Sequence, residues 1–243
     1  VAWRGVRVLD DVVLVSLDPV ATVIEPGAAA VQWADSTPQT AADGTRQAAL
    51  LFPAGTTATM TLADGSTQAL TELTVRATEY TVGESGPAAM PGPLPPNVGY
   101  TYAVELSVDE AMAAGATRVD FDRPVVSYVD NFIGFEVGEA VPFGWYDRQA
   151  GQWIADRDGV VLEALGAAAG LADIDTDGDG LADDPVALLA DHGIDAAERE
   201  ALAARYAPST QLWRVRVTHF TPCDYNWPWG PPDGASAPPP FFS

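Results

Sequence analysis

The chain has 243 residues, 12 of them basic and 34 acidic, so its formal net charge at neutral pH is −22. That charge excludes a protein that grips nucleic-acid phosphates, because such a protein needs clustered cations. It also disfavours docking on an anionic membrane surface. Hydrophobic residues make up 47%, which is enough for a real core. The chain has no run of about 18 apolar residues, so we expect no membrane insertion.

The first part of the chain predicts short β-strands separated by turns. Apolar runs occur at 6–9 and 12–17, and alternation at 59–62 leads into the turn Asp64-Gly65 and a strand at 73–77. The clearest strand covers 100–108, in which the even-numbered residues are apolar or aromatic and the odd-numbered ones are polar or small. That period of two places its apolar residues on one face of a sheet.

The pattern of strands continues after a short helical piece at 109–115. Further strands are predicted at 118–121, 125–129, 132–137 and 144–154, the last with a turn at Ala150-Gly151. Many short strands with turns between them are typical of a β-sandwich or barrel. We therefore predict a mainly β fold.

A small helical insert is predicted before the last strand. Asp184 and Pro185 are a good N-cap and first helical residue, and Gly193 suits the end of that helix. Asp195 and Glu198 have capping-box spacing for a second helix. We divide the chain into an N-terminal β segment (1–48), a β-sandwich (49–168), the loop and helical insert (169–208), the final strand (209–222) and a Pro/Trp-rich tail (223–243). The sequence leaves open whether 1–48 belongs to the same sandwich.

An acidic loop opens the insert and has the pattern of a calcium site. Calcium prefers six to eight hard oxygen ligands from alternate positions of a tight loop that contains glycine. Two frames fit: an EF-hand-like frame with Gly178 at its sixth position, and a D-x-D-x-D-G-x-x-D frame with Gly180 at the turn, which we prefer. A solvated acidic loop is the alternative, and Asp184-Pro185 also raises self-cleavage at that bond. The six candidate ligands are Asp173, Asp175, Asp177, Asp179, Asp183 and Asp184.

The final strand ends in the tripeptide His219-Phe220-Thr221, followed by Pro222. In one interpretation His219 is a half-buried, hydrogen-bonded histidine without a chemical role. In the other it is a general base for the Thr221 hydroxyl, which attacks the carbonyl of the preceding Phe220. The attack creates an oxyanion, which needs donors nearby, and gives an ester that water hydrolyses.

Several blocks resemble the ZU5-like module of bacterial RHS/YD-repeat cell-surface proteins. They are Leu51 to Thr56, Asn131 to Arg148, Gly170 to Asp184, and Thr218 to Pro222 with the segment Asn226 to Pro232. The resemblance covers about three-quarters of the chain, and its acidic loop is similar to thrombospondin-type and dockerin-type calcium loops. It implies a β-sandwich, an extracellular or cell-surface setting in a bacterium, and autoproteolysis between Phe220 and Thr221. The ZU5 signature most often has Ser where this chain has Thr221.

We therefore predict a self-cleaving domain, an enzyme only in an intramolecular, single-turnover sense. Its partners are the rest of a longer polypeptide and its own C-terminal fragment, with calcium as a structural metal and no nucleic acid. The alternative is a non-cleaving, calcium-stabilised spacer or adhesion module. A third possibility is a carbohydrate-binding or hydrolytic sandwich that uses exposed tryptophans, namely Trp145, Trp153, Trp227 and Trp229.

Overall fold

A computed structural model describes residues 13–83, 86–94 and 98–227 and divides them into short strands and a few helices. The strands are β1 (Thr22–Ile24), β2 (Gln32–Asp35), β3 (Gln39–Ala41), β4 (Gly44–Arg46), β5 (Ala48–Phe52), β6 (Ala58–Leu62), β7 (Thr67–Leu70), β8 (Leu73–Glu79), β9 (Ala103–Val108), β10 (Ala116–Asp130), β11 (Ala140–Val141), β12 (Gly144–Asp147), β13 (Gln152–Ala155), β14 (Gly159–Ala168), β15 (Leu171–Asp175), β16 (Thr210–Phe220) and β17 (Pro222–Asp224). The helical segments are η1 (Pro87–Ala89), α1 (Asp109–Ala113), α2 (Pro185–Ala187), η2 (Leu188–His192) and α3 (Ala196–Arg205).

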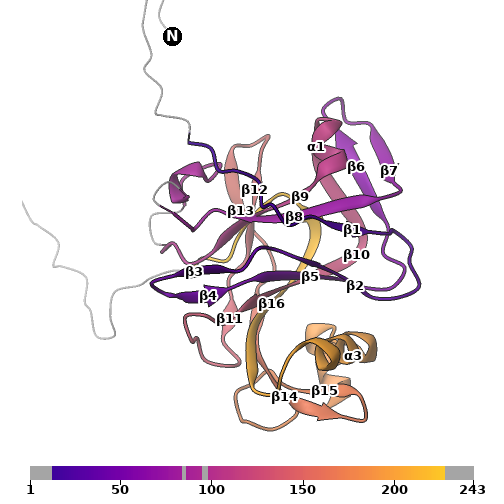
Figure 1. The fold of residues 1–243 in the computed structure, drawn as a ribbon, viewed down its shortest axis with the longest axis vertical. Coiled ribbons are helices and arrows are strands. Elements are labelled where there is room, and N and C mark those ends of the chain that lie inside the picture. Colours follow the sequence, from indigo (N-terminus) through magenta and orange to yellow (C-terminus); the bar gives the residue numbers. More distant parts are fainter. Residues whose placement is uncertain (1–12, 84–85, 95–97, 228–243) are drawn as a thin grey trace, which may run out of the picture.

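Two antiparallel sheets pack as a sandwich (Figure 1). In the described residues the smaller sheet has six strands, ordered β1-β8-β9-β17-β12-β13. The larger sheet has nine, built on the path β11-β14-β16-β10-β5-β2 with β15, β6 and β7 added at its sides, and β3 and β4 form a separate two-stranded sheet. The predicted mainly β sandwich with a helical insert is thus confirmed. The segment 1–48 contributes to both sheets, because β1 pairs with β8 and β2 pairs with β5.

The main core lies between the two sheets and is rich in aromatic side chains. Trp213 on β16 is fully buried at its centre. Its ring lies 5.0 Å from Phe132 and 4.7 Å from Trp227, and its Nε1 donates to Asn131 at 2.8 Å. The even-numbered residues of β9 face this core, as the alternation predicted, although Tyr100 is 56% exposed.

A second apolar cluster lies on the outer face of the larger sheet, below the sandwich in Figure 1. Leu188 and Leu202, from η2 and α3, cover this face. A buried ion pair ties the insert to the sheet, since Arg214 Nε donates to Glu198 Oε1 at 2.6 Å and Nη2 donates to Oε2 at 2.9 Å. Tyr128 also donates its hydroxyl hydrogen to Glu198.

The structure corrects several predicted elements. Residues 13–17 form no strand, and Leu14 is 85% exposed, while 6–9 lie outside the described residues. Residues 132–137 form turns, because Phe132 and Phe135 pack on Trp213 instead of joining a ladder. The predicted strands at 118–121 and 125–129 form one long strand, β10, whose pairing with β16 is irregular between Asp120 and Val125. Ten of the described strands had no counterpart among the predicted ones, namely β1, β2, β3, β4, β5, β7, β11, β14, β15 and β17.

The start of the insert follows the sequence closely. Asp184 caps α2 by accepting from the amide of Val186 at 2.7 Å, and Gly193 ends η2 with a positive φ of 70°. Asp195 caps α3 by accepting from the amide of Glu198 at 2.8 Å. The carboxylate of Glu198 does not complete the capping box, because it binds Arg214 instead.

Candidate functional site

The chain crosses from one sheet to the other at Thr221. β16 pairs with β10 and β14 in the larger sheet, whereas β17 pairs with β9 and β12 in the smaller sheet. Thr221 is the one residue between β16 and β17, so the Phe220–Thr221 peptide bond lies at the crossing. We call residues 219–222 the strand junction.

Phe220 fixes the junction in the core. Its ring lies 4.7 Å from that of Phe121 and 6.1 Å from that of Phe52, both in edge-to-face contact. Val215 and Val217 face this core, as expected for alternate residues of a strand. Phe220 also faces it, although alternation from Val217 would place residue 219 there. The irregular pairing with β10 near Asp120 accounts for this change.

His219 is buried beside the junction and its ring has an unpartnered nitrogen. The side chain is 8% exposed, and Nε2 has no hydrogen-bond partner in the described residues. Nδ1 lies 3.3 Å from the Thr218 hydroxyl, and the ring packs edge-on against Trp145 at 4.7 Å. Burial and the charge of Arg118 lower the pKa of His219 below 6.5, against the opposing effect of Asp120 and Asp156. The imidazole is therefore neutral at pH 7, the form that can accept a proton.

Thr221 is buried as well, with its hydroxyl 3.5 Å from the carbonyl oxygen of Pro222. His219 and Thr221 are neighbours at the junction, but no hydrogen bond joins their side chains in the described structure. A catalytic base and its nucleophile are often farther apart in the resting structure than in the reacting one, so His219 and Thr221 can still act together.

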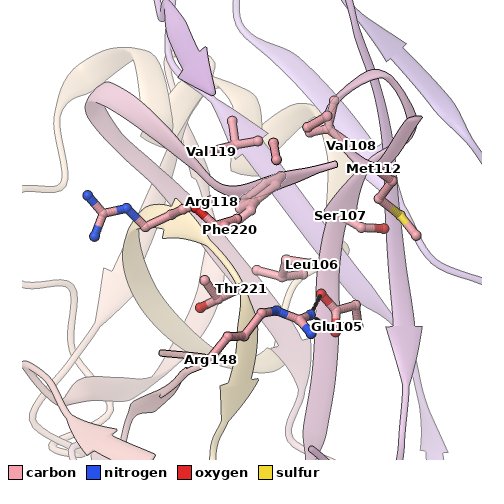
Figure 2. A pocket seen from close by; sticks show the side chains of 13 residues that line it. Glu105, Leu106, Ser107, Val108, Met112, Arg118, Val119, Arg148, Phe220 and Thr221 are labelled. Atoms are coloured by element: carbon pink, nitrogen blue, oxygen red, sulfur yellow. Dashed lines mark hydrogen bonds and ion pairs between the residues drawn. The ribbon is translucent and has the colours of Figure 1, made fainter. Parts of the chain in front are cut away.

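Two cavities flank Thr221. The first, of about 320 Å³, is also lined by Phe220 and by Glu105 on β9 (Figure 2). The second, of about 260 Å³, is also lined by Trp145, the residue that packs on His219. Both cavities share Thr117, Arg118, Arg148 and Thr221.

An ion pair that the sequence did not reveal lines the first cavity. Arg148 Nη2 donates to both carboxylate oxygens of Glu105 at 2.9 Å, and the Tyr80 hydroxyl donates to the same carboxylate at 2.7 Å. Burial raises the pKa of Glu105, opposed by Arg148 and Tyr80. The one feature of the sequence that pointed to this ion pair was a charged residue, Glu105, in the middle of the predicted strand at 100–108. Its partner, 43 positions away, could not be predicted from spacing.

The acidic loop gathers some of the six candidate carboxylates. Oxygens of Asp175, Asp177 and Asp183 lie within 4.8 Å of one another. Asp175 is 2% exposed and accepts from the amides of Gly178 at 2.7 Å and Gly180 at 2.8 Å. A side chain at Gly178 would lie 2.6 Å from the carbonyl oxygen of Val137, and φ there is +80°, so this position needs glycine.

The other three carboxylates have different partners. Asp179 accepts from the amide of Leu181 at 2.8 Å, Asp173 lies 3.7 Å from Arg199, and Asp184 caps α2. Of the two frames, the one with Gly180 at its turn contributes three clustered ligands, and the EF-hand-like frame contributes only Asp175 and Asp177. Carboxylate oxygens are the ligands that calcium prefers, so the clustered residues fit that ion.

The tryptophans proposed for sugar binding have packing partners. Trp153 donates from Nε1 to the carbonyl of Gly92 at 3.1 Å, and Trp227 stacks on Phe135 at 4.0 Å. Trp145 packs on His219, and Trp229 lies outside the described residues. These contacts favour structural roles for Trp145, Trp153 and Trp227.

Comparisons with protein-family models, with curated proteins and with solved structures find no match to this chain. The likeness to ZU5-like modules therefore depends on the sequence motifs alone. Among the described residues, no helix is both long and apolar enough to cross a bilayer. The structure itself defines a mainly β sandwich in which the chain passes from one sheet to the other between β16 and β17.

Proposed function

We propose that this chain is a self-cleaving domain that cuts the peptide bond between Phe220 and Thr221. The observation that carries the proposal is the buried, unpartnered Nε2 of a neutral His219 next to the point where the chain changes sheets. A buried nitrogen without a partner costs free energy, of the order of 1–3 kcal/mol. Buried polar groups without a partner are rare in native proteins, and a catalytic role is one of the explanations for them.

The reaction uses groups that the chain already holds at the junction. His219 takes the proton of the Thr221 hydroxyl, and the oxygen attacks the carbonyl carbon of Phe220, whose π electron pair moves to its oxygen. When that pair returns, the C–N bond breaks and the Thr221 nitrogen takes the proton back from His219, leaving an ester and a free amine. Water then adds to the ester carbonyl and the C–O bond breaks. One proton of the water goes to the Thr221 oxygen and the other to the free amine, so the products are a Phe220 carboxylate and a Thr221 that carries a hydroxyl and an ammonium group.

The contacts beyond the junction predict that the two products stay together. Tyr225 is fully buried and its hydroxyl hydrogen-bonds to Ser127 at 2.8 Å. Asn226 accepts from the amide of Tyr102 at 2.9 Å, and Trp227 stacks on Phe135. The 23 residues from Thr221 to Ser243 would separate from the rest only on denaturation.

The test is a time course of the purified chain, followed by denaturing electrophoresis and intact mass. We expect two fragments that meet after Phe220, and hydroxylamine should speed the cut by trapping the ester. Thr221→Ala and His219→Ala should stay intact, whereas Thr67→Ala, a matched exposed strand threonine, should behave as the wild type. A wild-type chain that remains whole over days, with and without calcium, would contradict the proposal. A cut after Asp184 would support the Asp-Pro alternative instead.

The rate should depend on pH through His219. Because only the neutral imidazole can accept the hydroxyl proton, the rate rises as pH increases through the pKa of His219. Burial places that pKa below 6.5, so we expect little further increase above pH 7. A rate that still climbs steeply between pH 7 and 8 would indicate another base.

A calcium-stabilised module that does not cut is the second candidate, favoured by the three clustered carboxylates of the acidic loop. Asp175, Asp177 and Asp183 would hold the ion and fix the start of the insert. Calcium at this loop and cleavage at the junction are compatible. Both suit the proposed setting, an extracellular or cell-surface segment of a longer bacterial polypeptide.

A further inference from the structure

Arg148 shares a cavity with the two residues whose peptide bond is proposed to break. Its side chain leaves the β12–β13 hairpin, passes below Thr221 and ends at Glu105 (Figure 2). It lines both cavities that flank Thr221. Arg118 also lines both, but Figure 2 shows its guanidinium directed away from the first cavity, and its Nε lies 2.9 Å from Asp120.

The Arg148 side chain is 49% exposed, and its guanidinium is tied to Glu105 and still has donors to offer. Both of its bonds to Glu105 come from Nη2, so within the described residues its Nη1 and Nε donate to no protein acceptor. Glu105 is itself fixed by the Tyr80 hydroxyl, and its side chain is 16% exposed. A guanidinium is charged at every relevant pH and pairs well with oxyanions and carboxylates.

The proposed reaction places negative charge on the same oxygen three times. The carbonyl oxygen of Phe220 becomes an oxyanion when Thr221 attacks and again when water attacks the ester, and the product is a carboxylate. In a chain of net charge −22 that charge needs a nearby cation or donor. Phe220 lines the first cavity together with Arg148.

We propose that Arg148 is a catalytic residue that stabilises the oxyanion on Phe220, and that Glu105 is the residue that positions it. This inference rests on the proposed self-cleavage. It adds to the His219–Thr221 pair a third group, contributed by the β12–β13 hairpin on another part of the chain. In both steps the carbonyl electron pair that moves to oxygen would face the guanidinium, and it returns to carbon when the C–N or C–O bond breaks.

The first test compares the cleavage rates of Arg148→Ala and wild type. Loss of one oxyanion donor slows comparable reactions roughly 100-fold or more, and we expect a loss of that order. Arg148→Lys should recover part of the rate, because it restores the charge without the planar fork. Arg157→Ala, which removes an exposed arginine far from the junction in sequence, is the matched control and should cleave as the wild type.

Chemical rescue separates a catalytic role from a structural one. Guanidinium chloride at low millimolar concentration should speed the Arg148→Ala variant several-fold, whereas equal sodium chloride should not. The wild type should not respond. A structural defect would not be repaired by a free guanidinium ion.

The positioning role of Glu105 is tested by a double-mutant cycle. Glu105→Gln should slow cleavage about tenfold, and it should have little further effect in the Arg148→Ala background, because it acts through that side chain. Equal effects in both backgrounds would overturn the positioning role.

The outcomes distinguish the two proposals. A wild type that cuts at Phe220–Thr221 with an equally fast Arg148→Ala overturns the role of Arg148 and leaves the self-cleavage standing. A slow, correctly folded Arg148→Ala that neither Arg148→Lys nor guanidinium improves also overturns it. A wild type that never cuts overturns both.

Discussion

The acidic loop and the strand junction both depend on charged groups, but they are held together in different ways. The hydrogen bonds that shape the loop are local: Asp175 reaches Gly180, five residues on, and Asp183 reaches back to Thr176, seven residues away. The junction is held by contacts from distant segments, including Phe52 and Phe121. The loop can therefore take its shape largely from its own sequence, whereas the junction exists only when the whole sandwich is formed.

One buried ion pair connects the two regions. Glu198 follows the loop on α3, and Arg214 lies on β16, the strand that carries the junction. Both side chains are nearly inaccessible, at 6% and 3% exposure. The following changes act on one of the two regions or on this ion pair, and they are best measured in the Thr221→Ala background so that cleavage does not interfere.

The largest effect should come from Phe220→Ala at the junction. The ring is 3% exposed and packs against Phe121 and Phe52, so its removal leaves a cavity between the sheets. We expect the free energy of unfolding to fall by about 3–5 kcal/mol, measured by urea denaturation. Leu181→Ala, at 67% exposure in the acidic loop, should change it little. A small loss at Phe220 would mean that the junction is not held by its core contacts.

The Glu198→Ala variant should break the connection between the regions. It leaves the Arg214 guanidinium buried without its carboxylate, at a cost of about 3 kcal/mol. Arg214→Met combined with Glu198→Leu removes both charges and should recover much of this loss. If the double variant is as unstable as the single one, packing rather than the unpaired charge is responsible.

Calcium should stabilise the folded chain by binding to the acidic loop. An ion that binds only the folded chain at 100 times its dissociation constant adds about 2.7 kcal/mol, seen as a higher melting temperature than in EDTA. Asp177→Asn should abolish the shift, because Asp177 is one of the clustered ligands. Glu72→Gln, which changes an exposed carboxylate just before β8, is the control and should keep it. A wild-type melting temperature that is the same with calcium and with EDTA would refute the calcium site.

The smallest effect should come from Asp224→Asn in β17, just after the junction. Burial raises the pKa of Asp224 from 3.8 to about 6, against the opposing hydrogen bonds from Asn226. The folded chain therefore binds this proton more tightly than the unfolded chain, and the stability it provides is lost as pH rises from about 4 to 6. The neutral variant escapes the loss, which for a pKa raised from 3.8 to about 6 is at most about 3 kcal/mol. Asp224 keeps some contact with solvent, which reduces the effect, so we expect a gain of about 1 kcal/mol over wild type at pH 8 and nothing at pH 4.

Thermal unfolding of Asp224→Asn and wild type at these two pH values measures the difference. Glu72→Gln, an exposed carboxylate replaced in the same way, should show no such pH dependence. A gain for Asp224→Asn that is equal at both pH values would show that burial of its charge is not the cause.

Local features of this fold could be predicted from the sequence. The caps of α2 and α3 at Asp184 and Asp195 need only a side-chain oxygen and the next few amides. The turn at Ala150-Gly151 and the buried face of β9 likewise follow from turn residues and a period of two. The apolar pattern failed at 13–17 and 132–137, where burial is decided by distant partners.

The sequence by itself determined the β class, the helical insert, the acidic loop and the order of the groups at 219–221. The sequence left two frames open for the acidic loop, and the folded structure brings Asp175, Asp177 and Asp183 together while Asp179 accepts from the amide of Leu181. Only the tertiary structure decided that β16 and β17 belong to different sheets and that Arg148 and Glu105 lie beside Thr221. Strand pairing joins residues that are far apart in the chain, and the spacing of residues along the sequence does not show which of them will pair.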